Sequence, residues 1–385
     1  MNISKNIIVG AGLTGTTLAY KIATELDEKV LVIDKRPHIA GNCYDEFDSE
    51  GLYLKKYGPH IFHTNDKKVW DFLSQFTNWH PFFLKTEAFI DGNLVNIPFN
   101  FDSIEKCFPK TLATRLEEKL LEKYEYNSRI SISQLLEQDD KDLKFLANYI
   151  YENVFKNYTE KQWGIKAEKV DKSVLTRVPI LISRDKRYFQ DRYQAIPQYG
   201  YTAMIEKMLD HPNIELILNT KFDKKTHKAE RLIFTGCIDE FFDYKYGKLP
   251  YRSLAFKFQK FDKEFCKDTS IVNYPNEYDF TRITEFKHFL DLKSEKTIIA
   301  TEYPQHYEPG KNEPYYPIAN KENHDLLAKY QTEAKNIDGL IIAGRLGEYK
   351  YYNIDAAVAR ALELFDKEVL NEFFKEKNNF GYSCR

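Results

Sequence analysis

Residues 5–35, KNIIVGAGLTGTTLAYKIATELDEKVLVIDK, decide the fold of this chain. An apolar run at 5–9 is followed directly by GAGLTG at 10–15, which has the spacing G-x-G-x-x-G, and a second apolar run at 30–33 ends at Asp34. Between the two runs, one face of a helix would carry Leu18, Ala19, Ile22, Ala23 and Leu26. This order of run, turn, helix and run predicts a complete βαβ unit.

The glycines and Asp34 of this unit suit a bound dinucleotide. Glycine permits the tight turn, the close approach of the backbone to a pyrophosphate, and close packing of the helix against the strand. Unpaired backbone N–H groups at the helix start attract the anion, and the Asp34 carboxylate can accept hydrogen bonds from the adenosine ribose. The simpler alternative is a glycine-rich turn that binds nothing, and the adjoining strand, helix and acid argue against it.

The composition excludes several kinds of partner. The 56 basic and 58 acidic residues give a net charge of −2, so no overall positive field attracts nucleic acid or an anionic membrane. The five cysteines are scattered without a C-x-x-C pair, which argues against a metal site or a disulfide framework and fits a reducing compartment. We therefore expect a cytoplasmic protein with no metal, no nucleic acid partner and no membrane insertion.

The length of 385 residues and the order of the patterns predict three domains. Strand and helix patterns at both ends and in the middle indicate a discontinuous dinucleotide-binding domain made of 1–80, 205–250 and 331–385. Residues 104–158 are charged and contain no glycine, which indicates a helical domain over 100–178. Alternating runs, with a hairpin turn at Asp91-Gly92, indicate an antiparallel sheet domain made of 81–99, 179–204 and 251–330.

Two further local patterns bear on the fold. Residues 65–76 predict a helix capped by Asn65 or Thr64. Near the C-terminus, an apolar strand ending in AGR at 343–345 is followed by a loop and a new helix start at 353–355. A second helix start can face a pyrophosphate or a charged ring. The arrangement resembles that of flavoproteins with a βαβ start, and this resemblance favours FAD over NAD. The alternative is an ordinary terminal strand and helix with no ligand.

Aromatic and arginine residues gather between 158 and 201. Planar rings can stack on a nucleobase, and an arginine fork can pair with two phosphate oxygens. The segment includes Tyr158, Trp163, Arg177 and Tyr188. Taken singly, the aromatic rings fit a hydrophobic core better than a ligand site.

Five segments together resemble one family. They are GPHIFHT (58–64), YTEKQWG (158–164), GCIDEFFDYKYGKLPYRSL (236–254), FTRITEFKH (280–288) and GRLGEYKYYNID (344–355). The chain closely resembles bacterial-type UDP-galactopyranose mutases from about residue 6 to about residue 365. The resemblance implies an α/β fold, with a Rossmann-like FAD-binding domain, an inserted helical bundle and an antiparallel β-sheet domain.

The resemblance also implies an activity. Members of the family are isomerases that interconvert UDP-galactopyranose and UDP-galactofuranose without net redox change, through a covalent adduct of the sugar's anomeric carbon with N5 of reduced FAD. A homodimer, and a product used for bacterial cell-surface polysaccharide, are implied in the same way. A loop around 168–180 that carries Arg177 resembles the family's mobile substrate loop.

The resemblance assigns site residues by motif position. Catalysis is assigned to His60, Arg177 and Arg282, and His63 is expected near the isoalloxazine with His60. Cofactor binding is assigned to Gly10, Gly12, Leu13, Gly15, Asp34, Lys35, Asn42, His60, Ile61, Arg345, Tyr352, Asn353, Ile354, Asp355, Ala356 and Ala357. Substrate binding is assigned to Phe155, Tyr158, Thr159, Trp163, Arg177, Tyr188, Asn273, Arg282, Tyr316 and Tyr351.

Other readings of the same residues stay open. An FAD-dependent oxidoreductase of the amine-oxidase-like class would share the βαβ start and the terminal helix, and a flavin-binding sensor would keep the fold without turnover. Another UDP-sugar, such as UDP-N-acetylgalactosamine, could also be a substrate. Three positions depart from the family pattern, namely Ala40, Ala195 and Asn353.

Overall fold

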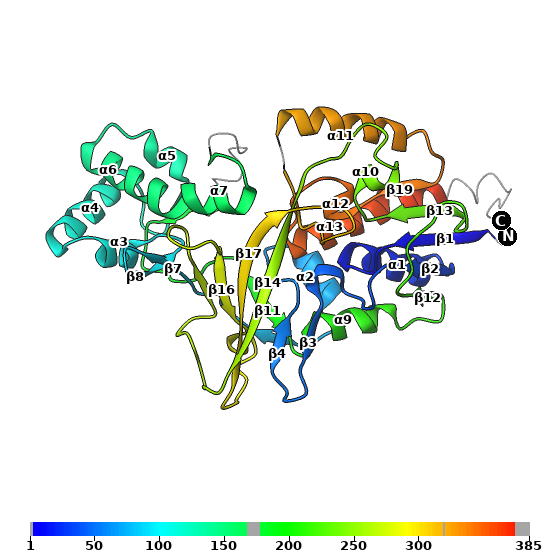
Figure 1. The fold of residues 1–385 in the computed structure, drawn as a ribbon, viewed down its shortest axis with the longest axis horizontal. Coiled ribbons are helices and arrows are strands. Elements are labelled where there is room, and N and C mark those ends of the chain that lie inside the picture. The colour runs from blue at the N-terminus through cyan, green and yellow to red at the C-terminus, as the bar shows by residue number, and fades with distance from the viewer. Residues whose placement is uncertain (1–2, 168–177, 319, 374–385) are drawn as a thin grey trace, which may run out of the picture.

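A parallel five-stranded sheet contains the predicted βαβ unit. The computed structural model describes residues 3–167, 178–318 and 320–373. The strand order is β12 (Ile214–Ile217), β2 (Val30–Ile33), β1 (Ser4–Val9), β13 (Ala229–Phe234) and β19 (Leu340–Ile342), and every neighbouring pair is parallel. The predicted unit is confirmed, and β1 lies at the centre of the sheet (Figure 1).

Helix α1 (Leu13–Glu25) packs against β1 and against two other helices, α9 (Gly200–Leu209) and α13 (Ile354–Leu364). Its buried face includes Leu18, Ala19, Ile22 and Ala23, which is the face that the sequence period predicts. α1 and α13 therefore lie side by side although their sequences are far apart.

The second large sheet has seven strands, ordered β18-β14-β17-β16-β15-β7-β8. The hairpin predicted at Asp91-Gly92 is confirmed as β7 (Thr86–Ile90) and β8 (Asn93–Ile97). The expectation of a purely antiparallel sheet is wrong at one place, because β15 (Ile271–Asn273) pairs with β7 in parallel. These two strands come from distant segments, so no tight turn forces them to run in opposite directions.

The strands of this sheet that follow residue 250 form a long central ladder. β14 (Tyr251–Phe261) pairs from Arg252 to Phe261 with β17 (Thr297–His306), and β16 (Arg282–Glu285) pairs with β17 and β15. β18 (Tyr316–Pro317) adds a short edge to β14. In Figure 1 this sheet stands between the parallel sheet on the right and a group of helices on the left.

The group of helices follows the charged, glycine-free stretch of the sequence. It comprises α3 (Phe101–Cys107), α4 (Lys110–Lys123), α5 (Ile132–Leu136), α6 (Lys141–Ile150), the π-helical η2 (Tyr151–Lys156) and α7 (Asn157–Trp163). Leu116, Leu120, Leu146 and Ile150 are fully buried in its core. A two-residue strand, β9 (Arg129–Ile130), interrupts the helices and pairs with β10 (Ile180–Leu181). The exact domain boundaries given above stay a prediction.

The helix expected at 65–76 is shorter than the pattern suggests and has a different cap. α2 runs over Lys67–Leu73, and the carboxylate of Asp66 accepts hydrogen bonds from the backbone N–H groups of Lys68 (2.8 Å) and Val69 (3.4 Å). The predicted caps, Asn65 and Thr64, are wrong because Thr64 belongs to β5 (Phe62–Thr64), which pairs with β11 (Tyr193–Pro197). β6 (Trp79–Pro81) completes this three-stranded sheet.

The remaining elements connect these layers. They are η1 (Gly41–Cys43), β3 (Asp45–Phe47), β4 (Tyr53–Lys55), α10 (Ile238–Phe241), η4 (Phe286–Phe289), α11 (Lys321–Ala334), α12 (Gly344–Gly347) and η5 (Phe365–Val369). Among the residues that the structure describes, no helix has both the length and the apolar character needed to cross a bilayer.

A buried ion pair fixes β3 and β4 to the start of α9. The Asp45 carboxylate lies 3.1 Å from Nζ of Lys55, and it also accepts hydrogen bonds from the Tyr53 hydroxyl and from the backbone N–H groups of Tyr201 and Thr202. Burial raises the pKa of Asp45, but Lys55 and these donors outweigh that effect and hold the pKa below its usual range. The stabilisation from Asp45 is therefore present near neutral pH and is lost as the pH falls.

We expect Asp45→Ala to lower the free energy of unfolding by about 3 kcal/mol, because Lys55 would stay buried without its counter-ion. Urea unfolding followed by circular dichroism measures the change. Glu308→Gln is the control, since Glu308 pairs with Lys311 at the exposed surface and its loss should leave the unfolding midpoint unchanged. Equal midpoints for Asp45→Ala and wild type would contradict this prediction.

Candidate active site

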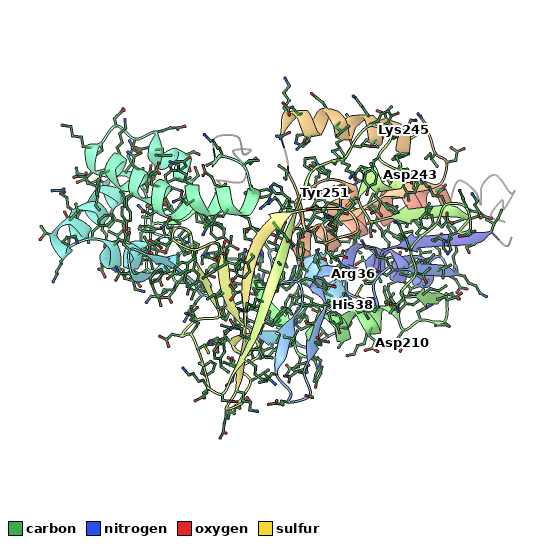
Figure 2. The ribbon with its side chains drawn as sticks, viewed as in Figure 1. Arg36, His38, Asp210, Asp243, Lys245 and Tyr251 are labelled. Atoms are coloured by element: carbon green, nitrogen blue, oxygen red, sulfur yellow. The ribbon has the colours of Figure 1, made fainter. Side chains whose placement is uncertain are left out.

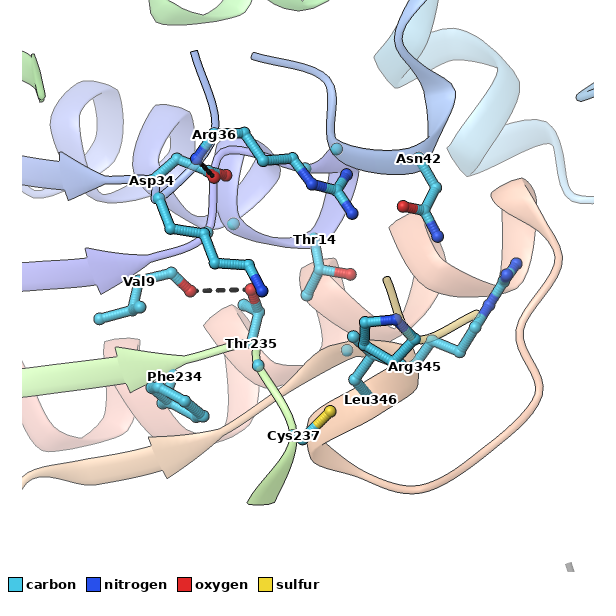
Figure 3. A pocket seen from close by; sticks show the side chains of 18 of the residues that line it. Val9, Thr14, Asp34, Arg36, Asn42, Phe234, Thr235, Cys237, Arg345 and Leu346 are labelled. Carbon is cyan, nitrogen blue, oxygen red and sulfur yellow. Dashed lines mark hydrogen bonds between the residues drawn. The ribbon is translucent and has the colours of Figure 1, made fainter. Parts of the chain in front are cut away.

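The first cavity lies at the carboxyl ends of the parallel strands and has a volume of about 690 Å³. Ligands of open α/β sheets bind at this edge. Figure 3 shows Val9, Thr14, Asp34 and Thr235 around it, with residues from both ends of the chain facing each other. Of the predicted cofactor residues, its wall includes Gly10, Gly12, Leu13, Gly15, Asp34, Lys35, Asn42, His60, Arg345, Asn353, Ile354 and Ala357.

The glycine loop is held closely from both sides. The Asp34 carboxylate accepts hydrogen bonds from the backbone N–H groups of Ala11 (2.8 Å) and Arg36 (2.9 Å). The Thr235 hydroxyl donates to the carbonyl oxygen of Val9 at 2.8 Å (Figure 3). A Cβ atom on Gly15 would overlap the carbonyl oxygen of Gly10, so the start of α1 reaches this position only with glycine there.

Two helix starts open onto this cavity. Among the described residues, no side chain caps α1 at Gly12, and no side chain caps α13 at Asn353. Their first backbone N–H groups thus carry partial positive charge and lack intrahelical partners. A dinucleotide with a central pyrophosphate suits a cavity with such donors at both sides.

Ala40 closes over the glycine loop in a strained conformation. Its φ of 70° lies in the left-handed region, which costs a residue with a Cβ about 1 kcal/mol. Its backbone N–H donates to the carbonyl oxygen of Ala11 at 2.8 Å, which holds η1 against the loop. The departure at Ala40 therefore leaves the loop contact in place and adds backbone strain.

Other parts of the first cavity's wall include 220–224 and Glu313, which no sequence pattern indicated. Residues 234–237 line it as well. Nη2 of Arg36 donates to the Glu313 carboxylate at 2.7 Å, and the guanidinium lies 4.5 Å from the centre of the Tyr57 ring. Arg36 lies near the middle of the molecule, where it joins the parallel sheet to the loop before β18 (Figure 2).

The second cavity, of about 380 Å³, lies between the helices and the seven-stranded sheet. Of the predicted substrate and cofactor residues, its wall includes Ile61, Phe155, Tyr158, Thr159, Trp163, Tyr188, Asn273, Arg282, Tyr316 and Tyr351. Gln162 and Phe189, which belong to the aromatic and arginine-rich stretch, also line it, whereas sequence patterns missed Leu84, Thr86, Ala88, Ile97 and Ile271. These are mostly apolar strand residues that no chemistry-bearing motif marks.

Arg282 is the central cation of the second cavity. Its Nη2 donates to the Tyr158 hydroxyl at 2.9 Å, and its Nε lies 3.2 Å from the buried carboxylate of Glu302. Burial lowers the pKa of Arg282, but Glu302 outweighs this effect and the pKa lies above its usual range. Arg282 therefore presents a permanent charge on a side chain that is 22% exposed.

Aromatic rings and a second arginine lie near this cation. The rings of Tyr316 and Tyr351 stack with their centres 5.4 Å apart, and Cζ of Arg345 lies 5.5 and 5.2 Å from those centres. The Arg345 guanidinium also donates to the carbonyl oxygen of Tyr352 at 2.5 Å. Hydroxyls and guanidinium groups in this arrangement suit a diphosphate.

The two cavities share part of their walls. His60, Arg345, Asn353 and Ile354 line both of them. Nδ1 of His60 donates to the carbonyl oxygen of Gly58 at 2.9 Å, so this imidazole is held in one orientation. Burial, together with the charges of Lys55 and Arg345, lowers the pKa of His60 to about 3. His60 is thus a neutral imidazole at the junction of the cavities at neutral pH.

Some predicted residues lie elsewhere. Tyr352, Asp355 and Ala356 line neither cavity. Arg177 and most of the loop expected around 168–180 lie outside the described residues. The individual roles assigned to all of these residues stay predictions.

The parallel sheet, the glycine loop and the two helix starts define a dinucleotide-binding protein of the Rossmann-like type. Residues 8–76 match the family model described as an NAD(P)-binding Rossmann-like domain, and residues 153–351 match the model described as UDP-galactopyranose mutase. The chain belongs to the UDP-galactopyranose mutase family. Membership makes it an isomerase of the intramolecular transferase type and implies a flavin cofactor.

Similar proteins cover nearly the whole chain. A probable UDP-galactopyranose mutase of Klebsiella pneumoniae is 34% identical and covers 95% of both chains. A dTDP-fucopyranose mutase of Escherichia coli is also 34% identical, over 94% of this chain and 97% of its own length. A crystal structure of reduced UDP-galactopyranose mutase has the same fold, with a TM-score of 0.72 and 17% identity over 96% of both chains.

Proposed function

We propose that the protein interconverts UDP-galactopyranose and UDP-galactofuranose with FAD, which is active in its reduced form. The observation that supports this most strongly is the position of Arg282. It is a permanent cation in a cavity that shares His60, Arg345, Asn353 and Ile354 with the dinucleotide cavity. A nucleotide diphosphate held there would present its sugar to whatever group fills the junction.

The residues of the first cavity fit FAD. The glycine loop and the start of α1 would hold the pyrophosphate, Asp34 the adenosine ribose, and the start of α13 the flavin ring. When bound in reduced form, the flavin supplies N5 as a nucleophile for the anomeric carbon of the sugar. The protein's own task is to hold the sugar at the junction and to exclude water.

The residues of the second cavity fit UDP-galactose. Phe155, Tyr158, Trp163 and Asn273 would hold the uridine. The diphosphate would be held by Arg282 with the hydroxyls of Tyr188, Tyr316 and Tyr351, and by Arg177. Donors placed around the departing diphosphate stabilise charge as the bond to the sugar breaks. Keeping UDP bound there allows the bond to re-form after the ring has changed size.

A second candidate substrate is dTDP-fucopyranose. The Escherichia coli relative that carries this name is as similar as the Klebsiella pneumoniae mutase. The apolar part of the second cavity, formed by Leu84, Ala88, Ile97 and Ile271, could accept a methyl group in place of a hydroxyl. The cytoplasmic location, the homodimer and the supply of galactofuranose for cell-surface polysaccharide are further parts of our proposal, and they rest on the family.

The test is a product assay with both sugars. The flavin-loaded protein is reduced with dithionite and incubated with UDP-galactofuranose or with dTDP-fucofuranose, and the products are separated by chromatography. We expect UDP-galactopyranose to form catalytically without stoichiometric consumption of the reductant. Faster conversion of the dTDP-sugar would support the second candidate. Consumption of one electron pair per turnover would instead support an oxidoreductase, a chemistry that the same fold carries in a putrescine oxidase with a TM-score of 0.59.

Trp163→Ala is expected to weaken UDP binding by about tenfold to a hundredfold, because an aromatic ring stacked on a base contributes about 1–3 kcal/mol. Trp163 is buried, and it lines only the second cavity. Flavin affinity should therefore stay unchanged. Titration calorimetry with UDP and flavin fluorescence measure the two affinities. Trp70→Ala is the control, because Trp70 stacks on Trp79 outside both cavities, and equal UDP affinities in the two variants would contradict the prediction.

A further inference from the structure

His63 and Asp191 form a pair at the wall of the second cavity. Nδ1 of His63 lies 2.9 Å from the Asp191 carboxylate, whose other oxygen accepts a hydrogen bond from the Asn65 amide at 2.6 Å. The ring of Phe189 stacks on the imidazole with centres 3.5 Å apart and planes 12° apart. Phe189 and Asp191, which are 126 and 128 positions away in the chain, therefore fix the orientation of the His63 imidazole.

The far nitrogen of His63 is available to a ligand. His63 and Phe189 both line the second cavity, and the His63 side chain is 13% exposed. Asp191 can only accept, so Nδ1 carries a proton in the neutral ring and Nε2 keeps its lone pair. Within the described parts of the chain, the side-chain hydrogen bond of this ring is made by Nδ1 and not by Nε2. This nitrogen can therefore accept or donate one proton within the cavity.

The two histidines of the GPHIFHT segment have opposite surroundings. His60 is buried near Lys55 and Arg345, both positive, so it does not take up a proton at neutral pH. His63 instead has the Asp191 carboxylate as its direct partner, 2.9 Å from Nδ1. The carboxylate partner and the stacked Phe189 ring thus distinguish His63 from His60 as a candidate for proton transfer.

Ring contraction requires one net proton movement. A pyranose carries hydrogen on the 4-oxygen and none on the 5-oxygen, whereas the furanose carries it on the 5-oxygen. The bond between C1 and the 5-oxygen breaks, and a bond between C1 and the 4-oxygen forms. One proton must therefore reach the 5-oxygen, and one must leave the 4-hydroxyl.

We propose that His63 carries this proton, with Asp191 as its positioning residue; this proposal rests on the function proposed above. The His63 imidazolium donates from Nε2 to the 5-oxygen as the C1–O5 bond breaks. The neutral ring then takes the proton of the 4-hydroxyl as the C1–O4 bond forms, which returns His63 to its first state. Atoms and charge balance, and no oxidant or reductant is consumed.

The experiment separates proton transfer from cleavage of the sugar–phosphate bond. UDP-galactopyranose with ¹⁸O in the bridge between the sugar and the phosphate is incubated with the dithionite-reduced holoenzyme. Movement of the label to non-bridging positions reports that the bond between the sugar and UDP breaks and re-forms. This exchange requires no proton transfer between the 4- and 5-oxygens. Formation of UDP-galactofuranose reports the whole contraction.

His63→Gln is expected to lower the rate of ring contraction by about 10² or more, which is the usual size of general acid–base catalysis, while the rate of label exchange stays within a few-fold of wild type. Asp191→Asn should also lower the rate of ring contraction more than the rate of label exchange, but by a smaller factor than His63→Gln. It should change the pH dependence of kcat as well. His80→Gln is the matched control, because His80 pairs with Asp291 at 3.3 Å outside both cavities and should leave both rates unchanged.

Three results would overturn the proposal or its basis. Unchanged ring contraction in His63→Gln, or an equal loss of contraction and label exchange, would remove the proton-carrying role while leaving the mutase function in place. An equal loss would point to a packing role under Phe189. If the wild-type holoenzyme shows neither exchange nor contraction, the proposed function itself fails.

Discussion

Arg282→Ala is expected to lower kcat/KM for the mutase reaction by about 10³, while the protein keeps its flavin. Arg282 lines the second cavity and not the first, so its loss should not weaken cofactor binding. The substitution removes the central cation of the second cavity and leaves the buried Glu302 carboxylate without its arginine partner. Loss of one such group at a developing charge usually costs about 10²–10³ in rate, and the uncompensated carboxylate adds to that cost. Steady-state kinetics and the visible absorbance of the flavin measure the two effects.

Two further variants limit what the Arg282 result can mean. Arg282→Lys keeps the positive charge but loses the planar guanidinium that can bind two phosphate oxygens at once. We therefore expect an intermediate loss of kcat/KM. Arg184→Ala removes an arginine that pairs with Asp102, Glu105 and Glu117 on the helical surface, and it should have the kcat/KM of wild type. If Arg282→Ala turns over at nearly the wild-type rate, the diphosphate is held elsewhere.

The second large effect is expected at the glycine loop, where two alanine variants should fail in different ways. Gly15→Ala should lose flavin and also unfold more easily, because its Cβ would overlap the carbonyl oxygen of Gly10 and push α1 away from β1. Overpacking of this kind costs about 1–3 kcal/mol. Gly12→Ala should lose flavin without a loss of stability. Its Cβ would lie at an ordinary 3.7 Å from Cα of Gly41, but it would occupy space in the first cavity where the pyrophosphate approaches the backbone.

Flavin titration and urea unfolding of the flavin-free variants distinguish these outcomes. The expected pattern is a lower unfolding midpoint only for Gly15→Ala, and at least about tenfold weaker flavin binding for both, which corresponds to about 1.4 kcal/mol. Wild-type flavin affinity in Gly12→Ala would mean that the pyrophosphate does not approach the start of α1.

Local patterns predicted the βαβ unit and the hairpin because each is determined by neighbours in the sequence. The bounds of β2 agree with the apolar run at 30–33, and the turn of β7 and β8 lies at Asp91-Gly92. Errors arose where distant partners decide the outcome. The parallel pairing of β15 with β7 joins segments that are more than a hundred residues apart, and β9 is too short for any period to reveal it.

In the site too, features that depend on neighbouring residues could be predicted, and contacts between distant segments could not. The motif segments indicated most residues that line the two cavities, including Arg282 and Tyr158, which the structure brings within 2.9 Å of each other. The wall formed by 220–224 and the Arg36–Glu313 ion pair carry no motif, so only the fold reveals them. The sequence likewise places His63 in a motif but gives no sign of its partner Asp191.

The strand order of the parallel sheet has a consequence for biosynthesis. β1 and its glycine loop leave the ribosome first, but the neighbour β13 follows only after residue 229, and α13 after residue 354. Until then the nascent chain exposes one open edge of β1, which is a template for wrong pairing. Flavin cannot complete its contacts before α13 has been synthesised, and a chaperone that shields this edge until then should raise the yield of active protein.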